Sequence, residues 1–220
     1  MAGNRAVTNE QKASRQQHII DAASFLFEKS DFKQITMSEI AQHAGLAKGT
    51  LFLYFKTKEA VFLSLAQQQI EQWFIRLDKK LELLVQSGTG TSTKKMVDLL
   101  ISSLDNDVLI RLLVILDDTL EQNIEYEREI AFKLFLKDRI LRSGNLIEQI
   151  LPGLEKEDGA KLFHLSFMCL VGAYKVCNPS RAMRAVIEQP GLEMFNRNFK
   201  ETLHEMITYL MWGFRTSKLA

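Results

Sequence analysis

A chain of 220 residues with 46% hydrophobic residues, 25% charged residues and a formal net charge of +1 can bury a sizeable core in one or two domains. Its three prolines and eleven glycines are too few for many short strands and favour an all-helical protein. The sequence has no run of about 18 apolar residues that would predict a membrane span, and its polar N-terminus is unlike a signal peptide. We therefore expect a cytoplasmic protein with no membrane partner.

The sequence offers little for metal binding or catalysis. Its four histidines are scattered, and none lies at metal-ligand spacing from a cysteine or another histidine. Cys169 and Cys177 fall on roughly one face of one expected helix, so buried reduced thiols are expected rather than a disulfide. The chain contains neither a GxSxG motif nor a Rossmann glycine motif after a strand. We expect no catalytic residue, no metal and no cofactor.

The N-terminal part of the chain predicts short helices with recognisable caps. The first helix is expected to begin at Ser14, whose hydroxyl can cap it. Gln17, three residues later, can complete a capping box with Ser14. A second helix is expected from Thr36, which can form a similar capping box with Glu39, to Gly45, because glycine suits the left-handed position after a helix. The apolar stripe of the first helix consists of Ile19, Ile20, Ala23, Leu26 and Phe27.

A third helix is predicted over residues 48–55. With the second helix and the tight glycine turn between them, it forms a helix-turn-helix. Leu51 and Phe55 are four residues apart and should point together into the small bundle. The opposite face carries Lys48, Gly49, Thr50, Leu53 and Tyr54, with Phe52 at its margin.

This opposite face carries groups that suit a groove of DNA. Gly49 lets the backbone approach a phosphate without an intervening side chain, and Leu53 can contact a thymine methyl group. Lys58, in the first turn of the next helix, adds a cation, and helix N-termini offer backbone N–H groups suited to phosphate. The alternative interpretation is a solvated helical hairpin with ordinary surface lysines.

Beyond the helix-turn-helix the pattern stays helical. Thr57 is expected to cap a long fourth helix that runs to Val85. The next stretch, QSGTGTSTKK, lacks the spacing of a phosphate-binding loop and follows a helix rather than a strand, so we expect a linker. Further helices are predicted at 93–104, 106–117, 119–150, 157–177 and 191–214.

The segment TMSEIAQHAGLAKGTLFLYFKTKEAVF, with IIDAASFLF upstream, resembles the DNA-binding domain of TetR-family transcriptional regulators over about residues 14–64. The resemblance implies an all-α homodimer and no enzyme activity. Residues 1–62, with the helix-turn-helix at about 36–55, would bind a near-palindromic double-stranded operator. Residues 63–220 would form a larger helical domain that dimerises and binds a small-molecule inducer. A second hypothesis keeps the DNA-binding head but replaces the inducer with a controlling protein partner.

The resemblance also implies which residues contact DNA. Thr36, Tyr54 and Lys58 would hold phosphates, while the remaining residues would lie in or beside the major groove. The full set is Thr36, Lys48, Gly49, Thr50, Phe52, Leu53, Tyr54 and Lys58.

Three residues depart from the family pattern. Asp31 stands where glycine is common after the first helix, and aspartate tolerates the left-handed conformation expected there. Ala47 stands where serine or threonine often caps the recognition helix. The loss of this cap costs about 0.5–2 kcal/mol of helix stability. Phe52 replaces the commoner tyrosine and removes one hydroxyl.

The last helices predict a dimer interface. We expect residues 158–177 and 191–214 of two chains to form a four-helix bundle. Gly172 would permit close approach of the helices, and Leu203, Met206 and Leu210 would line the interface of the last helix. The alternative is a well-buried core helix within one chain.

The resemblance also implies an apolar pocket for an apolar or cationic inducer, lined by aromatic and aliphatic residues of the C-terminal region. At such spacings these residues also fit an ordinary core, and both interpretations stay open. Asp117, Asp118 and Glu121 are adjacent acids that suit a cationic ligand or a helix-end surface cluster. The expected pocket residues are Trp73, Phe74, Leu112, Leu116, Phe132, Phe135, Phe163 and Phe167.

Overall fold

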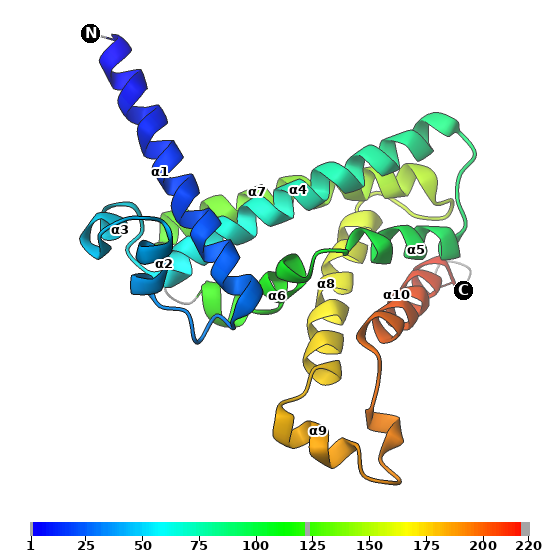
Figure 1. Ribbon diagram of the computed structural model, residues 1–220. Coiled ribbons are helices and arrows are strands. Elements are labelled where there is room, and N and C mark those ends of the chain that lie inside the picture. The colour runs from blue at the N-terminus through cyan, green and yellow to red at the C-terminus, as the bar shows by residue number, and fades with distance from the viewer. Residues whose placement is uncertain (1, 122–123, 217–220) are drawn as a thin grey trace. The chain divides into compact units, whose positions relative to one another are not determined.

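The computed structural model describes residues 2–121 and 124–216, and the side chains of 10–116, 118–121, 124–214. Every regular element in the described ranges is a helix, which confirms the all-α prediction (Figure 1). The α-helices are α1 Ala2–Lys29, α2 Met37–His43, α3 Lys48–Tyr54, α4 Lys58–Ser87, α5 Thr93–Ser103, α6 Asp107–Val114, α7 Tyr126–Ile150, α8 Asp158–Cys177, α9 Arg181–Ile187 and α10 Phe199–Thr216. A π-helical turn spans Leu116–Leu120, and a 3₁₀ turn spans Glu193–Phe195.

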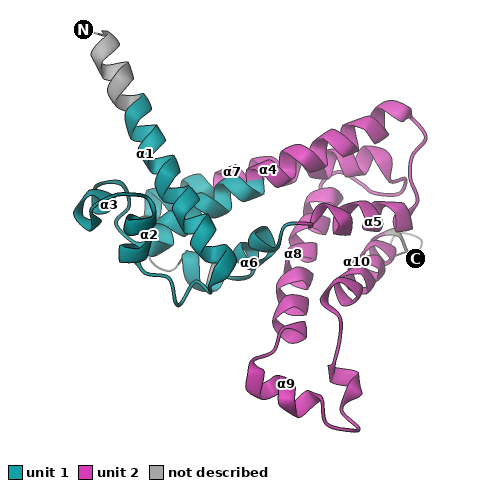
Figure 2. Ribbon diagram, viewed as in Figure 1, with its two compact units in different colours: residues 1–70, 106–132 teal, residues 71–105, 133–220 magenta. Residues whose placement is uncertain are grey.

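The chain divides into two compact units (Figure 2). The first, called here the head unit, contains residues 1–70 and 106–132, and the second, called the body unit, contains 71–105 and 133–220. We call residues 106–132 the returning segment, because they come after the first stretch of the body unit and pack with the head. The sequence had placed a single boundary at residue 62, with everything after it in the C-terminal domain.

Several helix boundaries differ from those predicted. α1 begins at Ala2 rather than at Ser14, so Ser14 and Gln17 lie inside the helix and do not form the predicted capping box. Residues 4–13 contain no proline or glycine and are compatible with a continuing helix. The predicted helix at 191–214 is shorter: Gly191 has a φ of +90°, and the Asn198 side chain accepts the N–H of Glu201, which starts α10. The predicted helix at 119–150 starts only at Tyr126.

The core of the head unit follows the predicted apolar stripe of α1. Ile19, Ala23 and Phe27 are fully buried, as are Ile40 of α2 and Leu51 of α3. The Phe62 ring meets the rings of both Phe27 and Phe32 edge to face, at centroid distances of 5.3 and 4.9 Å. Burying each such side chain stabilises the fold by about 1.5–3 kcal/mol, so these rings join α1 and α4.

The body unit contains a close helix crossing that the sequence did not predict. Gly144 of α7 and Gly159 of α8 touch so closely that a Cβ on Gly159 would lie 2.2 Å from the Gly144 carbonyl oxygen. Gly172, which was expected to permit close approach, is exposed and has no described atom within 4 Å of its Cβ position. Cys169 and Cys177 are free and only partly buried, rather than buried as expected.

Candidate nucleic-acid interface

The turn of the helix-turn-helix has the predicted geometry. Thr36 caps α2 and forms the expected capping box with Glu39. Gly45 follows α2 with a φ of +67°. The Gly45 and Leu46 N–H groups donate to the carbonyls of Gln42 and Ala41, so the last carbonyls of α2 are satisfied. These bonds fix the angle at which α3 leaves the turn.

The capping box occupies the polar groups of Thr36. Its hydroxyl and its backbone N–H both donate to the Glu39 carboxylate at 2.8 Å. These hydrogen bonds, the side-chain one first, lower the pKa of Glu39, and the positive charge of Lys58 adds to the effect. A phosphate that approaches Thr36 therefore meets a hydroxyl already engaged with a carboxylate.

α3 separates a buried face from an exposed one, as predicted. Leu51 and Phe55 are 0% and 2% exposed, whereas Leu53 is 75% exposed. Ala47 precedes α3 and supplies no side-chain cap. Of the other predicted DNA contacts on this helix, Lys48 and Gly49 are exposed, and Thr50, Phe52 and Tyr54 are partly buried.

Lys58 is placed differently from its exposed neighbours. Its Nζ donates to the backbone carbonyls of Phe32 and Ile35 at 2.6 and 2.7 Å, and lies 4.1 Å from the centroid of the Phe32 ring. Burial lowers the pKa of this lysine. Two of its three N–H groups are therefore committed to the loop between α1 and α2.

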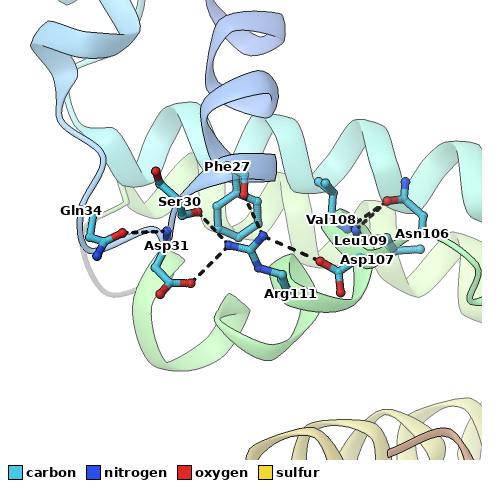
Figure 3. A network of polar contacts seen from close by, with 9 residues as sticks. All are labelled: Phe27, Ser30, Asp31, Gln34, Asn106, Asp107, Val108, Leu109 and Arg111. Atoms are coloured by element: carbon cyan, nitrogen blue, oxygen red, sulfur yellow. Dashed lines mark hydrogen bonds and ion pairs between the residues drawn. The ribbon is translucent and has the colours of Figure 1, made fainter. Parts of the chain in front are cut away.

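The turn after α1 is closed in a way the sequence did not suggest. Among the described non-glycine residues only Glu157 has a positive φ, so Asp31 does not adopt the left-handed conformation expected of it. Instead its carboxylate accepts a hydrogen bond from Arg111 of α6 (Figure 3). Glycine is common at this position and closes the helix by itself. The aspartate is therefore a sequence signal that a side chain from elsewhere in the chain closes this helix end.

A groove of about 670 Å³ lies beside the helix-turn-helix and was not predicted. It separates the N-terminal half of α1 from the turn between α2 and α3. Most of its lining side chains are charged, polar or small, and Leu46 is the one large apolar side chain among the lining residues, so the groove differs from the predicted apolar pocket. The lining residues are Glu10, Gln11, Ser14, Arg15, His18, Ala44, Gly45 and Leu46.

The eight predicted pocket residues are divided between the two units. Leu112, Leu116 and Phe132 are buried in the head unit. The other five belong to the body unit, where Trp73, Phe74 and Phe163 form an aromatic cluster with centroid distances of 4.6–6.2 Å. The Trp73 Nε1 donates to Ser103 at 2.9 Å. Phe135 and Phe167 are partly buried.

The predicted dimer residues also differ from one another in exposure. Leu203 is 1% exposed and is core of its own chain, so it is not available to a partner. Met206 and Leu210 are partly buried, and Gly172 is exposed. The sequence missed four exposed apolar residues on the same two helices: Met168 and Val176 of α8, and Tyr209 and Trp212 of α10.

Within the described ranges, α8 is one helix whose length and composition would allow it to cross a membrane. Only a minority of its residues are buried. It also packs against α10 in the body unit. Among the described residues, the apolar Met168 and Val176 of α8 are exposed.

The geometry of α2, the glycine turn and α3 defines a helix-turn-helix DNA-binding protein. Residues 19–65 match the family described as "Bacterial regulatory proteins, tetR family", and residues 67–218 match "Tetracyclin repressor-like, C-terminal domain". The chain belongs to the TetR family of transcriptional regulators. It is a DNA-binding regulator and not an enzyme.

The chain also resembles individual regulators in sequence or in structure. The fatty acid metabolism regulator protein of Bacillus subtilis is 36% identical over 73 residues, which are 33% of this chain and 38% of that protein. A TetR-family regulator from Mesorhizobium loti has the same fold, with 18% identity, coverage of 92% and 96% of the two chains, and a TM-score of 0.51. FadR from Bacillus subtilis, solved in complex with stearoyl-CoA, covers 87% of this chain and 97% of its own at 20% identity, with a TM-score of 0.49.

Proposed function

We propose that the protein is a homodimeric repressor that binds a near-palindromic operator and leaves it when a small molecule binds the body unit. The observation that carries the DNA-binding part is the division of α3 into a buried face and an exposed face. Leu53 is 75% exposed although it is a large apolar residue, and Lys48 and Gly49 are exposed beside it. An apolar side chain on such a face suits base readout in a major groove.

The proposed contacts fall into two classes. Lys48, Thr50, Phe52 and Leu53 face the major groove, with Gly49 giving the backbone room to approach. Thr36, Tyr54 and Lys58 contact phosphates. The Thr36 hydroxyl must release the Glu39 carboxylate to donate to a phosphate, and Lys58 offers the one N–H that the loop carbonyls do not take. Phosphate contacts position the protein, whereas base contacts specify the sequence.

The test of these roles starts from a duplex that the protein selects from a random-sequence pool. Lys48→Ala should weaken binding to this duplex, and Leu53→Ala should change which bases are preferred. Lys79→Ala, an exposed lysine of the body unit, is the matched control. Binding that no Lys48 or Leu53 variant alters would contradict the assignment of α3.

Dimerisation is supported by the uncovered apolar residues of α8 and α10. A second copy of the chain would cover them with its own α8 and α10, in a self-complementary four-helix arrangement. Met168→Glu would place a charge in this interface and should raise the dimer dissociation constant about 100-fold, or roughly 2.7 kcal/mol. Leu83→Glu, a matched change of an exposed leucine on α4, should leave the sedimentation of the dimer unchanged.

The inducer is proposed to bind near the aromatic cluster of Trp73, Phe74 and Phe163. The competing proposal, control by a protein partner without an inducer, is kept because these rings also form an ordinary core. A thermal-shift screen with apolar and cationic compounds separates the two. An inducer must bind less tightly in the presence of operator DNA, by the same factor by which it weakens operator binding.

A further inference from the structure

The returning segment lies within residues 67–218, which match the C-terminal domain of the family. It nevertheless packs in the head unit. Residues 106–132 follow α5 directly and continue into α7. The Asn106 side chain caps α6 by accepting the N–H groups of Val108 and Leu109, and its amide donates to Gln69 of α4 at 2.8 Å. The segment is therefore anchored at the residue where it enters the head unit.

Arg111 of α6 connects this segment with the end of α1 (Figure 3). Its Nη1 donates to the Phe27 carbonyl at 2.7 Å, and its Nη2 donates to the Ser30 carbonyl at 2.8 Å. Nη2 also pairs with Asp31 at 3.3 Å, and the guanidinium lies 4.2 Å from the centroid of the Phe27 ring. On its own helix Arg111 pairs with Asp107 at 3.7 Å.

These contacts replace a helix cap. The last carbonyls of a helix have no partner within the helix and carry partial negative charge, so a cation at this end is favourable. Glycine usually closes such an end by turning the chain. Here the closure comes from Arg111, which lies 81 residues further along the chain than Ser30.

The corner closed in this way leads directly into the DNA-binding helices. We call residues 27–36 the α1–α2 corner. Arg111 holds its beginning, Lys58 holds the carbonyls of Phe32 and Ile35, and Thr36 at its end caps α2. A shift of the corner therefore moves both Lys58 and the start of the helix-turn-helix.

A second arginine of the returning segment binds the other side of the head. Arg128, at the start of α7, donates to the Ala60 carbonyl at 3.0 Å and to the Ser64 hydroxyl. Its guanidinium lies 5.5 Å from the centroid of Phe55, the residue that ends α3. The returning segment thus contacts α1 through one arginine and α4 through another.

We propose that Arg111 is a positioning residue for operator binding: from the regulatory half of the sequence it fixes the α1–α2 corner, and with it the DNA-binding face. This inference rests on the proposed DNA-binding role of α3 and Lys58. No DNA contact is proposed for Arg111 itself, because its guanidinium donates to the carbonyls of Phe27 and Ser30 and to the Asp31 carboxylate. Any displacement of α6 relative to α1 would then change operator affinity.

The first measurement needs no DNA. Amide hydrogen exchange of full-length Arg111→Met should rise in residues 27–36 and stay near the wild-type rate in α5, α8 and α10. Arg142→Met is the matched control, because Arg142 pairs with Asp78 and Glu82 inside the body unit. It should leave exchange in the α1–α2 corner unchanged. Asp31→Ala removes only an exposed partner of Arg111 and should produce a smaller rise in the same residues.

The second measurement uses the duplex that the wild-type protein selects from a random pool. Arg111→Met should weaken binding on the order of tenfold, the scale of one lost charged hydrogen bond. The slope of log affinity against log salt should not change, because no phosphate contact is removed. Wild-type exchange in the corner, a uniform rise over the whole chain, or a slope shallower by about one unit would each overturn the proposal.

The two measurements separate this inference from the proposed function. A wild-type protein that selects no duplex would contradict DNA binding through α3 and, with it, the role of Arg111 in operator binding. A local rise in exchange together with unchanged affinity would instead leave operator binding intact and overturn the role of Arg111 alone.

Discussion

The two units of the molecule use their cationic side chains differently. In the head unit Lys58, Arg111 and Arg128 donate to backbone carbonyls, and Arg111 also pairs with the exposed carboxylates of Asp31 and Asp107. In the body unit Arg139 and Arg142 pair with carboxylates, those of Glu71, Asp78 and Glu82, at 2.8–3.0 Å. A bond to a carbonyl fixes the path of the chain itself, whereas a pair of side chains joins two helices and is weakened by salt where it is exposed.

The difference matches what each unit is proposed to do. The head unit must present α3 and the α1–α2 corner in one geometry, and its loops are held by the Thr36–Glu39 capping box and by cations that donate to backbone carbonyls. The body unit leaves apolar residues of α8 and α10 uncovered, which suits a surface that a second copy completes. Four pairs of substitutions compare sites within and between the two units.

The largest expected effect is in the head core. Leu51→Ala removes a fully buried side chain and should lower the free energy of unfolding by about 2–5 kcal/mol. Leu53→Ala, two residues away on the exposed face, should change it by less than about 0.5 kcal/mol. Chemical denaturation of both variants measures the difference. Equal losses would show that α3 is not divided into a buried and an exposed face.

The next effect probes the helix crossing of the body unit. Gly159→Ala places a Cβ against the Gly144 carbonyl and should cost about 1–3 kcal/mol through displaced backbone. Gly172→Ala, in the same helix but with open space around it, should instead gain up to about 1 kcal/mol from helix propensity. Thermal unfolding of the two variants should move in opposite directions. A destabilised Gly172→Ala would reveal a neighbour at that position.

A smaller effect is expected at the start of α2. Thr36→Ala removes the hydroxyl that accepts the Glu39 N–H at 3.3 Å and should cost about 1 kcal/mol. Thr57→Ala, which removes the hydroxyl that accepts the Ala60 N–H in α4, provides a comparison at a longer helix. Circular dichroism during urea unfolding measures both. A Thr36 variant as stable as the wild type would mean that Glu39 alone satisfies this helix end.

The smallest effect concerns pH. The pKa of Glu39 is lower in the folded protein than its ordinary value of 4.5, because Thr36 donates to its carboxylate. Stability from this group is therefore present above pH 4.5 and is lost as the pH falls through the lowered folded value. Glu39→Gln should reduce the loss of unfolding free energy at acid pH. Glu193 is an exposed acid of the body unit whose carboxylate has its own backbone hydrogen bonds. Glu193→Gln should therefore leave the stability of the head unit unchanged.

The sequence by itself determined the structural features that depend only on residues close together in the chain. The Thr36–Glu39 capping box, the glycine turn at Gly45, the buried stripe of α1 and the two faces of α3 all arise within about one or two helical turns. The resemblance to TetR-family regulators covered the same short region. These features were predicted correctly because each involves residues close in sequence, whose geometry local hydrogen bonds and helical periodicity fix.

Only the tertiary structure decided how distant parts meet. Arg111 closes α1 from 81 residues beyond Ser30, Leu203 lies in the core although its spacing also fitted an interface, and Gly144 meets Gly159 while Gly172 stays open. The helical pattern of α6, α8 and α10 shows which residues share a face. It does not show which face meets another helix, because that depends on how the whole chain packs to cover its apolar surface and satisfy its buried polar groups.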